Sequence, residues 1–88
     1  MTMIDIQVFD TYVEGSKGQM HFDVFMPKGK SANDAIESAK KYLKSIGEEK
    51  AKVTSKECSY CHIQQAQPKE EEEIKSKGYF IYKMSGCP

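Results

Sequence analysis

The residues of this 88-residue chain that could do chemistry gather in one short motif. Cys58 and Cys61 are separated by two residues and are followed directly by His62, and a third cysteine, Cys87, lies near the C-terminus. Two thiolates at this spacing can bind one tetrahedral zinc ion from a single tight turn, and a further cysteine or histidine can complete its coordination. The leading hypothesis is therefore a metal or thiol site, with zinc as the metal, formed by Cys58, Cys61, Cys87 and His62.

Three other interpretations of the motif stay open. A Cys-x-x-Cys pair can cycle between dithiol and disulfide when a helix N-terminus lowers the pKa of one thiol, but the next expected helix begins only at Pro68. The motif also has the pattern of c-type haem attachment, although residues 1–6 lack the basic start and long apolar stretch of an export signal. Finally, the cysteines can be small side chains that stabilise a long loop by packing.

A second group of polar residues allows acid–base chemistry. His21 and Asp23 alternate with apolar residues, and we expect them on a polar sheet face together with Thr11. Asp10 falls instead on the expected apolar face, near the end of a strand. An enzyme using Asp10, His21 or Asp23 requires a pocket that joins Asp10 to His21. A solvated sheet face explains the same residues, so the sequence favours no enzymatic activity.

Composition limits the classes of partner. Thirteen basic and thirteen acidic side chains cancel, so no net charge attracts the chain to nucleic acid or to an anionic membrane. No apolar run approaches the roughly 20 residues that span a bilayer. The three cysteines are an odd number, which argues against a disulfide framework. We expect a single cytoplasmic domain over residues 1–88, a monomer or weak homodimer, that binds neither nucleic acid nor membrane.

The elements that must position these residues begin with a hairpin. Apolar residues alternate along Met3–Val13 and Gln19–Met26, as in half-buried strands, and a short polar turn containing glycine joins the two. A turn centred on Ser16 pairs Val8 with Val24, which places the apolar faces of both strands on the same side. A slip of one residue would put these faces on opposite sides of the sheet.

Two helices and two further strands are expected after the hairpin. Apolar residues at three- and four-residue spacing, with cap residues at both ends, predict a helix bounded by Ser31–Gly47. Lys50–Ser55 has the lysine-lined pattern of a short edge strand, and Glu57–Gln67, which holds the cysteines, is expected to be a long connection. A second helix is expected over Pro68–Gly78 and an interior strand over Tyr79–Met84.

This order, β-β-α-β-α-β, defines an α+β fold. Helical connections before and after the third strand favour parallel pairing through right-handed crossovers. We therefore expect two layers, with a mixed four-stranded sheet and two helices on one face. Such a sheet would place Cys58 and Cys87 at the same edge. If the last two strands are antiparallel, as in a β-grasp arrangement, Cys87 lies far from Cys58.

Five blocks of the chain are distinctive: Val8–Val13, Met20–Val24, Ser45–Glu49, Cys58-x-x-Cys61-His62 and Gly78–Cys87. Together they closely resemble a family of small bacterial proteins known as a domain of unknown function, DUF2024. The resemblance covers essentially the whole chain and implies a compact two-layer domain, but no reaction, substrate, cofactor or partner. The rival to the metal or thiol hypothesis is thus an interaction module with inert cysteines, working through a sheet face or edge.

Overall fold

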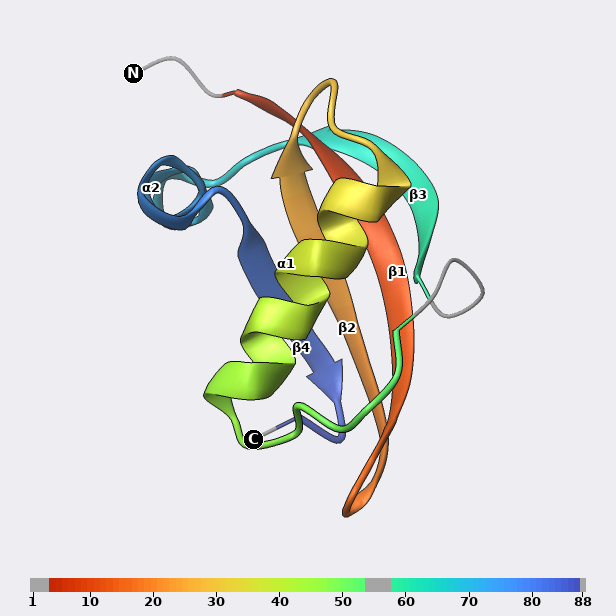
Figure 1. The fold of residues 1–88 in the computed structure, drawn as a ribbon. Coiled ribbons are helices and arrows are strands. Elements are labelled where there is room, and N and C mark those ends of the chain that lie inside the picture. Colours follow the sequence, from red (N-terminus) through yellow and green to blue (C-terminus); the bar gives the residue numbers. More distant parts are fainter. Residues whose placement is uncertain (1–3, 54–57, 88) are drawn as a thin grey trace.

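The computed structural model describes residues 4–53 and 58–87 of the chain. Within these residues the order of elements is the predicted β-β-α-β-α-β, which confirms the α+β fold. The elements, labelled in Figure 1, are β1 (Asp5–Gly15), β2 (Gly18–Pro27), α1 (Ala32–Ser45), β3 (Cys58–Gln65), α2 (Pro68–Lys77) and β4 (Phe80–Ser85).

The sheet is antiparallel throughout, and the predicted mixed sheet is wrong. Its strand order is β3-β1-β2-β4, and each neighbouring pair is antiparallel. The long β1–β2 hairpin occupies the two central places. Strand β3 pairs with β1 on one side of it, and β4 pairs with β2 on the other. As a result β3 runs in the same direction as β2, as expected for a helical crossover, but β1 lies between them. The two last strands, β3 and β4, form opposite edges of the sheet.

The third strand lies later in the chain than predicted. Lys50–Val53, the described part of the expected strand 50–55, forms a turn and irregular backbone, and residues 54 and 55 lie outside the described part. Strand β3 instead occupies the segment expected to be a loop, and Cys58 is its only fully buried side chain. Its residues lack apolar alternation because an edge strand is held mainly by backbone hydrogen bonds to one neighbour. The cysteine motif therefore lies on a strand.

The hairpin register differs by one residue from the prediction. Val8 pairs with Phe25 rather than with Val24, because the connection between the strands is a two-residue turn, Ser16-Lys17. Both faces of the hairpin carry apolar side chains, so this register buries a different set on each face. The shift decides which polar residues meet in the candidate site.

Helix α1 packs on one face of the sheet and covers the main core. Its start is fixed by the predicted Ser31 cap, since the Ser31 side chain accepts a hydrogen bond from the backbone of Asp34 and the Asp34 carboxylate accepts one from the backbone of Ser31. The crossing of α1 in front of the sheet is visible in Figure 1. The core beneath it contains Phe9, Val13, Met20, Phe22, Val24 and Met26 from the hairpin, with Ala35, Ile36, Ala39, Tyr42 and Leu43 from α1.

Helix α2 lies beside β4 and contacts the opposite face, so the predicted placement of both helices on one face is wrong. It inserts Ile74 into a second, smaller cluster with Ile6, Val8, Phe25 and Ala66. Side chains alternate between the two faces of a strand, so Ile6 and Val8 point away from α1. The helix has a single buried apolar residue, Ile74, and therefore covers only one end of this face.

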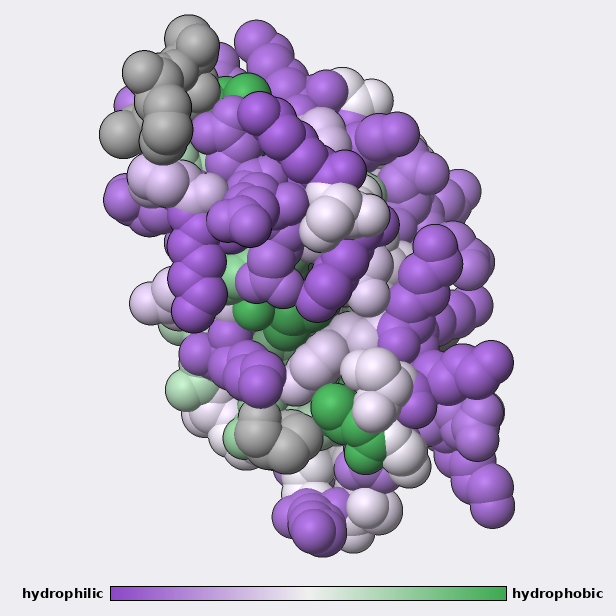
Figure 2. Space-filling view, turned by 90° about the vertical axis from the view of Figure 1, so that its left-hand side faces the viewer, coloured by the Kyte–Doolittle hydropathy of each residue, from purple (hydrophilic) through white to green (hydrophobic). Residues whose placement is uncertain are grey.

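The side of the molecule that carries α2 is largely hydrophilic, with hydrophobic residues visible in a depression (Figure 2). A groove between α1 and the α2–β4 segment is lined by apolar side chains such as Tyr42, Ile46 and Phe80 and by charged ones such as Glu73 and Lys77. No helix among residues 4–53 and 58–87 has the length and hydropathy needed to cross a membrane.

Candidate functional site

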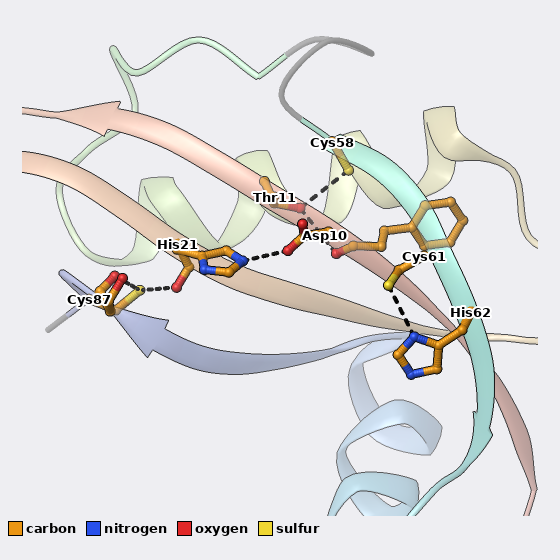
Figure 3. Close-up of polar contacts among 9 residues, drawn as sticks. Asp10, Thr11, His21, Cys58, Cys61, His62 and Cys87 are labelled. Atoms are coloured by element: carbon orange, nitrogen blue, oxygen red, sulfur yellow. Dashed lines mark hydrogen bonds and ion pairs between the residues drawn. The ribbon is translucent and has the colours of Figure 1, made fainter.

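Cys58, the first residue of the predicted motif, is part of the core. It is 1% exposed and pairs with Thr11 of β1, whose Oγ1 lies 3.4 Å from the Cys58 Sγ and can donate to it (Figure 3). Burial raises the pKa of the Cys58 thiol, and the hydrogen bond from Thr11 offsets only part of this effect. Cys58 is therefore a neutral, packed thiol.

Cys87 lies against β2 and the main core, on the other side of β1 from Cys58. It follows β4, whereas Cys58 belongs to β3, and two strands separate these edges. The Cys87 Sγ lies against β2, two strand spacings from β3. At about 4.8 Å per spacing this is roughly 10 Å, whereas zinc–sulfur bonds of about 2.3 Å require ligand sulfurs to be much closer. The Cys87 Sγ instead lies 3.5 Å from the backbone oxygen of His21 (Figure 3).

Of the four residues predicted to form the metal or thiol site, Cys61 and His62 are the pair that the structure brings into contact. The Cys61 Sγ lies 3.1 Å from the His62 Nδ1, and both side chains are exposed on β3 (Figure 3). The four residues predicted as one centre thus occupy three separate places: the core, the exposed side of β3, and the end of β4.

A different group has the proximity that a metal site requires. One carboxylate oxygen each from Asp10 and Asp23 and one ring nitrogen of His21 all lie within 4.8 Å of one another. Within the described part of the chain, no other set of three or more histidine, cysteine, aspartate or glutamate side chains is this close. His21 Nε2 contacts the Asp10 Oδ1 directly (Figure 3), and the side chains of His21 and Asp10 are 19% and 33% exposed.

The hairpin register assembles this group. Asp10 of β1 and Asp23 of β2 are direct cross-strand partners, and His21 is the partner of Tyr12. All four side chains project from the face opposite α1, since Thr11 and Phe22 between them are fully buried under α1. Helix α2 covers the other end of this face and leaves these four residues partly accessible.

The surroundings of Asp23 raise the pKa of its carboxyl group. Burial raises the pKa of Asp23, and the neighbouring Asp10 raises it further through a hydrogen bond and like-charge repulsion. The charges of His21 and His62 lower it but do not reverse the shift. Ionising both of two adjacent carboxyl groups costs free energy because the like charges repel. A proton or a cation between them is therefore favoured.

Tyr12 holds the imidazole in place. Its ring stacks on the His21 ring, with centroids 4.1 Å apart and planes 11° apart. Tyr12 itself is 43% exposed. The stacking restricts rotation of His21 and keeps its Nε2 directed at Asp10.

The sequence prediction named these residues but grouped them wrongly. It placed Thr11 with His21 and Asp23 and put Asp10 on the apolar face. The observed register buries Thr11 completely and puts Asp10 opposite Asp23. The signal was present in the matching pairs Asp10-x-Tyr12 and His21-x-Asp23, but their meeting depends on a register that differs by one residue from the predicted one.

Fold and site together define a small α+β domain whose antiparallel sheet carries a carboxylate–imidazole group on the uncovered part of one face. The chain belongs to the family known as Domain of unknown function (DUF2024), whose profile matches residues 4–84. It is similar to the NMR structure of protein NE1680 from Nitrosomonas europaea, a structural genomics target, with 51% identity and a TM-score of 0.86 over 97% of this chain and 100% of that one. No curated protein matches it. These findings confirm the family resemblance and the fold.

Proposed function

We propose that the protein binds a divalent transition-metal ion through Asp10, His21 and Asp23. The observation that carries this proposal is the convergence of two carboxylates and one imidazole within 4.8 Å on a partly buried sheet face. Bonds of about 2.0–2.2 Å from a metal to nitrogen and oxygen place the ligand atoms roughly 3–4 Å from one another. Small movements of the three side chains therefore suffice to close the site.

The chemistry of the ligands indicates which ions fit. Imidazole suits zinc, iron and nickel, whereas calcium and magnesium prefer oxygen ligands alone. One nitrogen and two carboxylate oxygens therefore favour zinc, manganese or ferrous iron. Three protein ligands leave at least one coordination position for water or a small anion, which is the arrangement of reactive rather than purely structural metal sites. This proposal moves the zinc hypothesis from the cysteines to the carboxylates.

Charge balance supports a cation at this position. His21, when protonated, can neutralise one carboxylate, and the second is then left to hold a proton, consistent with the raised pKa of Asp23. A divalent ion between Asp10 and Asp23 would neutralise both carboxylates and displace that proton. Because metal ligands must be deprotonated, metal binding should release protons and should strengthen as the pH rises through the raised pKa of Asp23.

Equilibrium dialysis of untagged, fully reduced protein against zinc or manganese, with metal analysis, tests the proposal. We expect about one ion per chain, lost in Asp10→Asn and in His21→Ala. Cys61→Ser is the matched control, because it removes a ligand of the cysteine site and leaves the carboxylate site intact. Binding that survives His21→Ala but disappears in Cys61→Ser would refute the carboxylate site and restore the cysteine site.

A second candidate is an interaction module that pairs with another copy of the chain. The edge strands carry exposed apolar residues, Tyr60 and Ile63 on β3 and Tyr82 and Met84 on β4. An edge strand with such side chains can add a strand from a partner. Sedimentation velocity over a range of concentrations tests this idea: a dimer that dissociates in Ile63→Lys would favour it, and a monomer at every concentration would exclude pairing between copies.

A further inference from the structure

The contact between Cys61 and His62 depends on a β-bulge. Adjacent residues of a regular strand point to opposite faces, so these two side chains would ordinarily diverge. The pairing of β3 with β1 shifts at this point: Tyr60 pairs with Phe9, and His62 pairs with Val8, so Cys61 is the extra residue. Bulges redirect side chains and are common at sheet edges and near active sites. Here the bulge brings the Cys61 Sγ to 3.1 Å from the His62 Nδ1.

Gln64 orients the imidazole. Its Oε1 lies 2.7 Å from the His62 Nε2. A carboxamide oxygen can only accept a hydrogen bond, so the Nε2 carries the hydrogen and the Nδ1 presents its lone pair to the thiol. Cys61, His62 and Gln64 thus form a series of nucleophile, base and orienting group, which is the general arrangement of an activated nucleophile. All three come from one short stretch of a single edge strand.

We propose that Cys61 is a reactive thiol that exchanges with low-molecular-weight disulfides, with His62 as its base and Gln64 as a positioning residue. The His62 Nδ1 takes the thiol proton, and the Cys61 sulfur attacks one sulfur of the disulfide. The bond between Cys61 and that sulfur forms while the disulfide bond of the reagent breaks. The departing thiolate then takes the proton from His62, so one disulfide and one thiol yield a mixed disulfide and one thiol.

The positions of the other cysteines determine how the mixed disulfide is removed. Resolution within the chain would require a second thiol that can reach the Cys61 sulfur. Cys58 is buried in the core beside Thr11, and Cys87 lies against β2, with β1 between it and β3. Neither can attack, so the mixed disulfide should persist until an external thiol reduces it. A persistent mixed disulfide on Cys61 follows, and it does not require the proposed metal site.

Incubation of metal-free, reduced protein with oxidised glutathione, followed by intact-mass and peptide mass spectrometry, tests this inference. We expect one mixed disulfide, located on Cys61 and absent in Cys61→Ser. An unassisted thiol with a pKa of about 8.5 is only ~1% thiolate at pH 6.5. His62→Ala should therefore slow the reaction about tenfold or more at pH 6.5, and the difference should shrink toward pH 9.5.

Two variants of Gln64 test whether this residue positions the His62 imidazole or whether exposure of Cys61 alone explains its reactivity. Gln64→Ala should slow the reaction at pH 6.5 by a smaller factor than His62→Ala, whereas Gln64→Glu keeps an acceptor for the Nε2 and should preserve the wild-type rate. Far-UV circular dichroism confirms folding of each variant. Equal rates and pH profiles for wild type and His62→Ala, or glutathione found mainly on Cys58 or Cys87, would overturn the inference.

Discussion

Asp10 and Asp23 face each other directly across the β1–β2 hairpin, on the sheet face opposite α1. Like charges in directly opposed positions destabilise a sheet, and only one imidazole, that of His21, contacts the pair. Holding the two carboxylates together therefore costs the hairpin part of its folding free energy. A bound metal ion would offset this cost.

Replacing Asp23 with asparagine should stabilise the metal-free protein at pH 7. The folded-state pKa of Asp23 is raised above 3.8, so between 3.8 and the raised value the folded state binds more protons than the unfolded state. Stability is then lost as the pH rises through this window, and the Asp23→Asn variant would avoid that loss. We expect a gain of about 0.2–1 kcal/mol, the usual size of a like-charge cross-strand pair.

Urea unfolding in the presence of a chelator measures this gain. Asp5→Asn is the control, because Asp5 is exposed at the start of the neighbouring strand β1 and pairs with Gln65 rather than with a charged residue. A loss of stability in Asp23→Asn at pH 7 would show that the ionised pair does not strain the hairpin.

Removing the ring that stacks on His21 should weaken metal binding without removing a ligand. Tyr12→Ala frees the imidazole to rotate, and groups that orient a metal-binding histidine typically contribute about 10–100-fold to affinity. We therefore expect the dissociation constant, measured in competition with a zinc indicator, to rise about tenfold. Tyr12→Phe retains the stacked ring and should bind like the wild type; an equal loss in both variants would point to the Tyr12 hydroxyl instead of the ring.

Gly86, which precedes Cys87, should tolerate no side chain. Its φ is +70°, and a Cβ at this position would lie 2.2 Å from the backbone oxygen of Gln19. Gly86→Ala should therefore destabilise the protein by about 1–3 kcal/mol, because it adds a backbone clash to conformational strain. Gly29→Ala is the matched control: Gly29 also has positive φ, at +97°, but its Cβ would meet no atom within 4 Å. Thermal unfolding that gives equal losses for both variants would contradict the clash.

The elements with strong local signals were predictable from the sequence. Ser31 caps α1 as expected, and α2 begins at Pro68 and is followed by Gly78 in left-handed conformation. Strand β3 was missed because an edge strand with one fully buried residue, Cys58, has no apolar period to detect. The antiparallel order was missed for two reasons: β3 runs in the expected direction but pairs with β1 and not with β2, and β4 pairs with β2 and runs opposite to β3 although a helix connects them.

The site was only partly predictable, for a related reason. The residue types of Asp10, His21 and Asp23 suggested chemistry, but their grouping depends on a two-residue turn that shifts the hairpin register by one. The Cys61–His62 contact depends on a β-bulge, which sequence spacing does not reveal. The residue types could be read from the sequence, whereas which of these side chains lie together depends on the pairing of the strands.

The most direct test of the metal site uses the fact that the chain has two histidines, one in each candidate site. Zinc titration of ¹⁵N-labelled, reduced protein, followed through the imidazole nitrogen resonances, reports on His21 and His62 separately. We predict that the His21 resonances change strongly and saturate at one equivalent, while those of His62 change much less. Changes confined to His62, or no change at either ring, would contradict a metal ion held by Asp10, His21 and Asp23.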